Sequence, residues 1–250
     1  MKRNNNIILP KIIGHRGVKN LAPENTLDSI SKAFDIGLHW VEVDVKITKD
    51  NVPFLLHDDS LERTTNGHGL ANLKKYSEIK LLDAGYYFYN KKTKIYPPSL
   101  QEVLELIRQK KKSLNIELKP NKGFEQLNVI KTIEVIEKFS DLEIYYSSFD
   151  IDSCILLKEI LPKSHCGLLI DDFEIIKLQD IIELCNKFDF FLCGLNYKIV
   201  SKDIIDVFNY NKISLNVFSD ENININQAKN LWHMGIKSIF SDDPRNLIIV

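Results

Sequence analysis

Short apolar runs alternate with longer amphipathic segments along this chain of 250 residues, and this alternation constrains the fold most strongly. Eight runs have the length and apolar content of buried strands, and they lie at Ile12–Gly17, Val41–Ile47, Ser113–Lys119, Ile144–Phe149, Cys166–Ile170, Phe190–Asn196, Ile213–Phe218 and Ser238–Ser241. Helical periodicity falls between most of them, at Thr26–Ile36, from Ser99 onward, and at Phe124–Phe139, Ile151–Leu161, Phe173–Phe188, Lys202–Tyr210 and Ile225–His233. Such alternation predicts an α/β fold, and eight units in this length predict a closed TIM-type (β/α)8 barrel.

One segment, residues 59–98, breaks the alternation. It follows an extra apolar run, Val52–Leu56, which is joined to the second predicted strand across Asp50 and Asn51. We expect a tight turn there, because Asn tolerates left-handed backbone. We therefore predict one barrel domain over residues 1–250, with residues 59–98 as a small insertion after the second barrel strand. The insertion would lie on the face where barrel loops build active sites.

The overall composition excludes several classes of protein. A hydrophobic fraction of 44% and a charged fraction of 27% are ordinary for a globular chain. The balance of 33 basic and 34 acidic residues argues against a nucleic-acid partner. The apolar run Ile7–Leu9 ends at Pro10 and is too short for a secretion signal, and no stretch is long enough to insert stably in a membrane.

The four cysteines indicate a reducing compartment. Because they lie in apolar stretches without CxxC spacing, we interpret them as buried thiols and expect a cytoplasmic protein; they are Cys154, Cys166, Cys185 and Cys193. The helix that begins at Ser99 has Glu102 three residues later, which predicts a capping box.

Two acidic residues lie on one face of the second predicted strand. Glu42 and Asp44 alternate with valines, so both carboxylates face the barrel interior, roughly 6–7 Å apart along the strand. Buried carboxylates need partners or a cation. On spacing alone, ion pairs are an equal alternative, with Arg16, Lys46 or Lys119 as the partner.

The third predicted strand favours a site over simple ion pairs. In Ser113–Lys119 the apolar side chains have one parity, whereas Asn115, Glu117 and Lys119 have the other. Polar interior residues at the carboxyl end of a barrel strand are typical of an active site. Glu117 joins the two carboxylates of the second strand as a third oxygen donor, which suits one divalent cation, Mg²⁺ or Ca²⁺.

Two histidines lie near the same barrel mouth. His15 ends the first predicted strand, next to Arg16, and His57 ends the extra strand-like run. A lone histidine at a strand end is more often structural, but two can divide acid and base duties near neutral pH. The other four histidines lack such company, and we assign them to the surface or to packing.

A charge count indicates the class of ligand. Glu42, Asp44 and Glu117 carry −3, Arg16 and Lys119 carry +2, and a divalent cation would add +2. The resulting +1 would be balanced by a phosphodiester, for which Arg and Lys are suitable partners. A cationic substrate is therefore disfavoured.

Taken together, these residues resemble the glycerophosphodiester phosphodiesterase family. The resemblance runs in order through nearly the whole chain and rests on the joint spacing of short motifs: His15–Gly17, Pro23–Thr26, Glu42–Asp44, His57–Asp58, Leu61–Gly69, Pro98–Leu104, Asn115–Lys119, Ser148–Phe149 and Ser241–Pro244. It implies a TIM-type barrel with an insertion after the second strand.

The resemblance also implies a reaction and a set of roles. A glycerophosphodiester would be converted to sn-glycerol 3-phosphate and an alcohol, with the metal on the three carboxylates named above. His15 and His57 would be the acid/base pair, with His15 as base and His57 as acid in our working hypothesis, and Arg16 and Lys119 would bind the phosphate. The nucleophile is water or the substrate's own hydroxyl, and the sequence leaves open the head group, the preferred metal and the oligomeric state.

Other functions compete with this one. A lysophospholipase D would use the same site on a membrane-derived lipid, whereas a non-catalytic phosphate-binding barrel would require the loss of a histidine or an acidic ligand. Phe218 stands where the family commonly has Trp, so it is either a contact to the glycerol end of the substrate or a core aromatic. The aromatic run Tyr86–Tyr89 either packs the insertion onto the barrel, which we favour, or covers the mouth.

Overall fold

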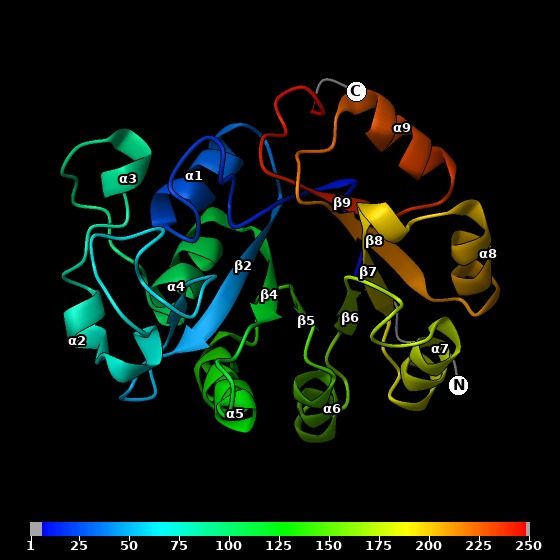
Figure 1. The fold of residues 1–250 in the computed structure, drawn as a ribbon, viewed down its shortest axis with the longest axis horizontal. Helices are drawn as coiled ribbons and strands as arrows, with labels where there is room; N and C mark the ends of the chain where they lie inside the picture. Colours follow the sequence, from blue (N-terminus) through cyan, green and yellow to red (C-terminus); the bar gives the residue numbers. More distant parts are fainter. Residues whose placement is uncertain (1–6, 249–250) are drawn as a thin grey trace.

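The computed structural model describes residues 7–248, and in this range nine strands form one sheet that closes into a barrel (Figure 1). Eight of the strands run parallel to their neighbours in the order β1-β9-β8-β7-β6-β5-β4-β2, and β2 pairs back with β1. The barrel strands are β1 (Ile12–Gly14), β2 (Trp40–Ile47), β4 (Ser113–Leu118), β5 (Ile144–Ser148), β6 (Cys166–Ile170), β7 (Leu192–Asn196), β8 (Ser214–Phe218) and β9 (Ser238–Ser241). The predicted TIM barrel is confirmed.

The ninth strand, β3 (Pro53–Leu55), lies outside the barrel ring. It pairs antiparallel with the carboxyl end of β2, where Val45 is opposite Leu55. The turn between the two strands contains Asn51 with φ 62°, which confirms the predicted left-handed position. β2 therefore contacts β1 near its start and β3 near its end.

Helices follow the strands around the outside of the barrel. They are α1 (Leu27–Asp35), α4 (Leu100–Lys110), α5 (Glu125–Ile136), α6 (Ile151–Ile160), α7 (Leu178–Lys187), α8 (Lys202–Tyr210) and α9 (Ile225–His233). The predicted capping box of α4 is present, because Ser99 accepts from the Glu102 amide and Glu102 from the Ser99 amide. α7 begins later than the predicted Phe173, because Lys177 has extended backbone with ψ 146°.

Apolar side chains pack on both faces of the barrel strands, outside against the helices and inside the barrel. The outward side chains of β2, Val41, Val43 and Val45, pack with the helices in the main core. The interior below the site is filled by a second cluster, in which Trp40 and Tyr145 lie with ring centroids 5.6 Å apart. Polar side chains replace these aromatic rings toward the carboxyl ends of β2 and β4, and this change positions the site.

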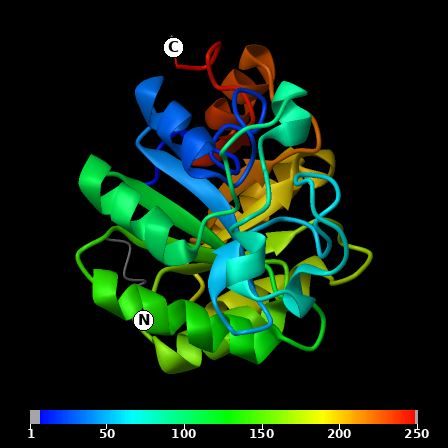
Figure 2. The same ribbon diagram turned by 90° about the vertical axis from the view of Figure 1, so that its left-hand side faces the viewer.

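Residues 59–98 form an outgrowth beside the barrel, coloured cyan to teal at the left of Figure 1 and facing the viewer in Figure 2. They contain the short elements η1 (Ala71–Leu73), α2 (Tyr76–Ile79) and α3 (Tyr86–Tyr89). A small apolar cluster joins this segment to β3 and the residue that follows it, and its buried members are Phe54, Leu56, Leu61, Ala71 and Ile79.

The cysteines and the lengths of the helices can be compared with the sequence-based expectations. All four cysteines are buried and free, as predicted. Within residues 7–248, every helix is too short or too polar to cross a lipid bilayer.

Candidate active site

The turn after β1 carries the first two site residues. The strand stops at Gly14 rather than at the predicted Gly17, because Arg16 and Gly17 have φ values of 51° and 81°. A side chain at Gly17 would bring its Cβ within 2.0 Å of Ser29 Oγ, so only glycine fits against α1. This tight turn directs His15 and Arg16 toward the barrel mouth.

Three carboxylates meet at the carboxyl ends of neighbouring strands. Glu42 and Asp44 come from β2 and Glu117 from β4, and the register places Asp44 opposite Glu117. All three side chains are buried, and one oxygen of each lies within 4.8 Å of the others. The structure thus brings the three predicted metal ligands together.

Asp44 is the most heavily bonded of the three. Its Oδ2 accepts from Asn25 Nδ2 at 2.8 Å, and its backbone amide donates to Asn25 Oδ1 at 3.1 Å. Arg16 Nε lies 3.3 Å from Oδ2, and Lys119 Nζ lies 3.5 Å from Oδ1. Burial alone would raise the pKa of Asp44, but the two cations hold it well below its usual range.

Glu42 and Glu117 have the opposite behaviour. Burial, together with the neighbouring carboxylates, raises the pKa of Glu42 well above its usual range, and burial also raises the pKa of Glu117. Glu42 Oε2 accepts from the Arg16 amide at 2.9 Å, whereas its buried Oε1 has no hydrogen-bond partner among the described residues. A hard divalent cation would satisfy this orphaned oxygen and stabilise the ionised carboxylates, so the donor set fits Mg²⁺ or Ca²⁺.

The two predicted phosphate-binding cations flank the carboxylates. Arg16 Nη1 donates to Glu24 at 2.8 Å, and Lys119 Nζ donates to Glu117 at 2.8 Å and lies 5.4 Å from the centre of the Phe149 ring. Burial opposes their charge, but the surrounding carboxylates raise the pKa of both side chains above its ordinary value. Both remain cationic near neutral pH.

Ion pairing, which the sequence left as an alternative, takes place with two of its three partners. Lys46 is the exception, because its Nζ donates to Asp59 at 2.8 Å and to the Lys119 carbonyl at 3.1 Å. The pairs of Arg16 and Lys119 leave Glu42 Oε1 unsatisfied, so ion pairing alone does not complete this cluster.

His15 is held by a carboxylate from the last barrel strand's loop. Its Nδ1 lies 2.7 Å from Asp242 Oδ1, and its Nε2 lies 4.0 Å from Glu42 Oε2. Lys19 Nζ contacts the other Asp242 oxygen at 3.1 Å. Burial lowers the pKa of His15, with Asp242 acting against it, so the neutral imidazole is favoured; its Nδ1–H faces the Asp242 carboxylate, which leaves the lone pair on Nε2.

His57 has a similar support on the other side of the mouth. Its Nδ1 lies 2.6 Å from Asp58, which also accepts from Arg63 Nε at 2.6 Å. Arg63 donates in turn to Glu24, the partner of Arg16, so one chain of charged groups joins the two sides. Burial lowers the pKa of His57, and the nearby carboxylates Asp44 and Asp58 act in the opposite direction.

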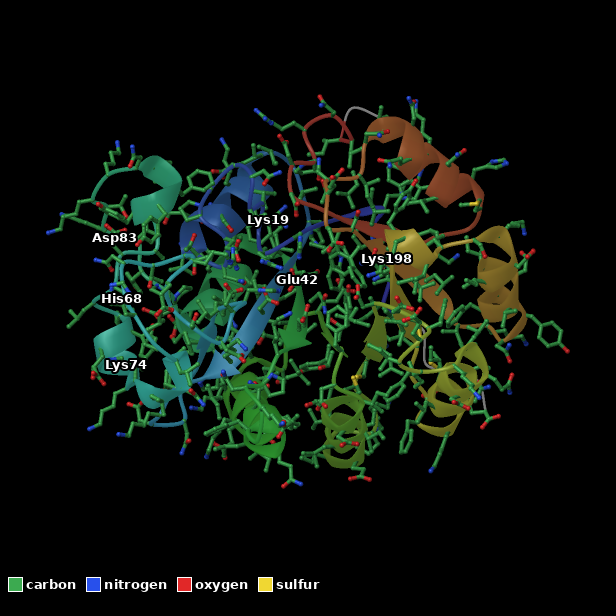
Figure 3. All side chains as sticks on the ribbon, in the orientation of Figure 1. Lys19, Glu42, His68, Lys74, Asp83 and Lys198 are labelled. Carbon is green, nitrogen blue, oxygen red and sulfur yellow. The ribbon has the colours of Figure 1, made fainter. Side chains whose placement is uncertain are left out.

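A cavity of about 250 Å³ unites these groups, with all the predicted site residues in its wall except Asp44, which lies buried beside them. The predicted residues that line it are His15, Arg16, Glu42, His57, Glu117, Lys119 and Phe218. Phe218 packs edge-to-face on Phe149 with centroids 5.4 Å apart. Figure 3 shows Glu42 near the centre of the barrel and Lys19 on the adjoining loop.

The supporting residues that were assigned no role from the sequence include Lys19, Asn25 and Asp242. They lie in the loops after β1 and β9, far in sequence from the groups that they hold. Asn25 and Asp242 belong to the motifs Pro23–Thr26 and Ser241–Pro244, so the resemblance contained a signal for two of them. Lys19 lies outside every motif.

Known proteins resemble this chain over nearly all of its length. A glycerophosphodiester phosphodiesterase of Bacillus altitudinis is 31% identical over 242 residues, which cover 94% of this chain and 96% of that protein. The solved structure of an Oleispira antarctica phosphodiesterase, in complex with the product sn-glycerol 3-phosphate, is 29% identical with a TM-score of 0.88, and covers 96% of both chains.

A second solved structure supports the fold alone. The structure from Silicibacter pomeroyi is 20% identical, with a TM-score of 0.83 over 96% of this chain and 93% of that one. The model of the glycerophosphoryl diester phosphodiesterase family matches residues 15–246. With the barrel, the acidic cluster and these similarities established, the chain belongs to the glycerophosphoryl diester phosphodiesterase family.

Proposed function

We propose that this protein hydrolyses glycerophosphodiesters to sn-glycerol 3-phosphate and an alcohol, using one divalent cation and two histidines. The observation that carries the proposal is a single cavity lined by acidic, basic and imidazole groups. The three carboxylates and two basic residues counted from the sequence sum to −1, so a divalent cation would bring these five groups to +1, which a phosphodiester monoanion would balance. The Bacillus altitudinis relative is named a glycerophosphodiester phosphodiesterase, and the Oleispira antarctica phosphodiesterase is solved with the product sn-glycerol 3-phosphate bound.

Glu42, Asp44 and Glu117 would hold the cation. The unsatisfied Glu42 Oε1 and the oxygen-only donor set support Mg²⁺ or Ca²⁺. When bound, the cation would polarise a phosphoryl oxygen and offset developing negative charge. Arg16 and Lys119 would fix the phosphate, since both stay charged beside the cluster.

His15 acts as the base and His57 as the acid in this proposal. A lowered pKa keeps His15 neutral, so its Nε2 can remove a proton from the nucleophile, while Asp242 orients the ring through Nδ1. His57 must be protonated to donate to the leaving alkoxide; Asp58 favours its imidazolium, and the negative charge of a bound phosphodiester would do so too. Each proton transfer contributes about 10²- to 10⁴-fold to the rate.

The nucleophile is water or the substrate's own glycerol hydroxyl, and these give different intermediates. Attack by the hydroxyl forms a five-membered cyclic phosphate and expels the alcohol, after which water opens the ring. Attack by water forms sn-glycerol 3-phosphate directly. Phosphorus NMR during turnover distinguishes them, because only the first route produces a cyclic phosphate resonance.

Substitutions at the site test the assignment. We expect His15→Ala and Glu117→Ala to lower kcat on sn-glycero-3-phosphocholine by about 10²-fold or more. His39→Ala and Glu105→Ala are matched controls, since both side chains are exposed and lie outside the cavity. Full hydrolysis by the first two variants would contradict the assignment. Hydrolysis by the wild-type chain would exclude the non-catalytic phosphate-binding barrel.

Lysophospholipase D activity is the second candidate. It is favoured by the exposed aromatic rings of Tyr86–Tyr89 beside the barrel, which could contact an acyl chain. Parallel assays of sn-glycero-3-phosphocholine and lysophosphatidylcholine decide between the two, and a preference for the lysolipid would overturn our first choice. With either substrate, Phe218 would contact the glycerol end.

The four buried free thiols support a reducing compartment such as the cytoplasm.

A further inference from the structure

Exposed apolar side chains gather on residues 59–98. Seven of the sixteen large hydrophobic side chains that are exposed within residues 7–248 lie in this segment, and they are Leu70, Leu73, Leu81, Tyr86, Tyr87, Phe88 and Tyr89. The four consecutive rings of α3 are 41–53% exposed. Each ring is therefore about half buried, and the remaining half is accessible to a partner. Such a concentration marks an interaction surface.

The same segment is basic, although the chain is not. Residues 59–98 contain seven Lys and Arg and four Asp and Glu, so their net charge is +3, whereas the whole chain carries −1. Lys91, Lys92 and Lys94 directly follow α3 and are exposed. In the described part of the chain, none of the three lies within 4.0 Å of a carboxylate. Their charges are available to an anionic partner.

This surface adjoins the mouth of the proposed catalytic cavity. Tyr87 and Phe88 line a second pocket of about 250 Å³ together with Lys19 and Arg63, and Lys19 also lines the first cavity. Figure 3 shows His68 and Lys74 on the same side of the barrel, to the left of Glu42. Whatever binds α3 therefore lies close to the entrance for substrate.

We propose that α3 and the lysines after it dock the protein on a lipid bilayer that contains anionic phospholipids. Half-exposed Tyr and Phe rings suit the membrane–water interface, where an apolar ring is buried and a hydroxyl stays hydrated. Each lysine near an anionic bilayer adds electrostatic attraction to it. Docking of this kind needs no membrane-spanning helix.

A protein with an acidic surface is the competing partner. The bilayer is favoured because the apolar surface and the basic groups lie beside a cavity whose proposed substrates derive from phospholipids, and in this respect the inference rests on the proposed function. Docking would place the cavity mouth where such compounds are released.

Vesicle flotation of the full chain tests the proposal. We expect binding to phosphatidylcholine vesicles that contain phosphatidylglycerol, weaker binding to pure phosphatidylcholine, and loss of binding at high salt. Tyr87→Ser with Phe88→Ser, and separately Lys91→Glu with Lys92→Glu, should each reduce the bound fraction about tenfold. Tyr210→Ser with Lys229→Glu is the matched control, since both residues are exposed on other helices and should leave binding unchanged.

Two readouts separate this proposal from the catalytic one. The docking variants should keep the wild-type rate on soluble sn-glycero-3-phosphocholine, and His15→Ala should keep wild-type vesicle binding. Circular dichroism of each variant verifies that the fold is intact. The docking proposal is overturned if the wild-type chain does not float with anionic vesicles, if both double variants bind like the wild type, or if binding requires a second protein.

Discussion

At the scale of single residues, Asn25 supports the acidic cluster without being a proposed metal ligand. It donates to the Asp44 carboxylate and accepts from the Asp44 amide, and its own backbone has φ 55°. A side chain that bonds both the carboxylate and the backbone amide of a metal ligand fixes the orientation of that carboxylate.

We predict that Asn25→Gly weakens binding of Mg²⁺ or Ca²⁺ by about 10- to 100-fold, because Asp44 loses its support while the left-handed backbone is still accommodated. Calorimetric titration of the metal-free protein measures the affinity. Asn226→Ala, on the exposed face of α9, is the control. An unchanged affinity for Asn25→Gly would show that Asn25 does not support the ligand.

At the scale of elements, the turn between β1 and α1 depends on Gly17. We predict that Gly17→Ala lowers the free energy of unfolding by about 2–4 kcal/mol. The alanine Cβ would overlap Ser29, and the alanine backbone would be held at positive φ. Gly69→Ala is the matched control, since Gly69 also has positive φ but its Cβ would meet nothing within 4 Å. Urea denaturation of both variants measures the difference, and equal losses would contradict a steric role.

The start of α4 joins the barrel to the outgrowth through Glu102. Its carboxylate accepts from Tyr76 at 2.6 Å, from Lys80 at 2.8 Å and from the Ser99 amide at 2.9 Å. Partial burial would raise the pKa of Glu102, but these donors lower it to about 2. The folded state therefore holds this carboxylate ionised below the pH at which the unfolded chain protonates it.

This shift predicts a pH-dependent contribution to stability. A lowered pKa stabilises the fold above the ordinary value of 4.5, and the stabilisation is lost as the pH falls toward 2. We expect Glu102→Gln to cost about 1–2 kcal/mol at neutral pH, after discounting for solvent screening, and progressively less below pH 4.5. Urea denaturation across this pH range, with Glu105→Gln as control, measures it. A cost that is constant with pH would refute the ionic contribution.

For the whole molecule, the sequence was sufficient to predict the barrel and most of the side chains that the structure gathers at the candidate site. The alternation of short apolar runs with amphipathic segments predicts where strands and helices lie. The positions of Glu42, Asp44 and Glu117 within their strands predict that these side chains share the barrel interior. Contacts across the closed barrel were not predictable in this way. His15 and Asp242 are 227 residues apart and meet only because β9 pairs with β1. Periodicity also does not determine how loops pack, which is why the aromatic surface of α3 emerged only from the structure.

In the proposed reaction, a divalent cation on the acidic cluster is required to hydrolyse a glycerophosphodiester. Phosphorus NMR of sn-glycero-3-phosphocholine with the chelator-treated protein tests it most directly. We predict that the phosphodiester resonance persists until Mg²⁺ or Ca²⁺ is added, and that the resonance of sn-glycerol 3-phosphate then replaces it. Conversion at the full rate in excess chelator, or no conversion with either metal, would contradict the claim.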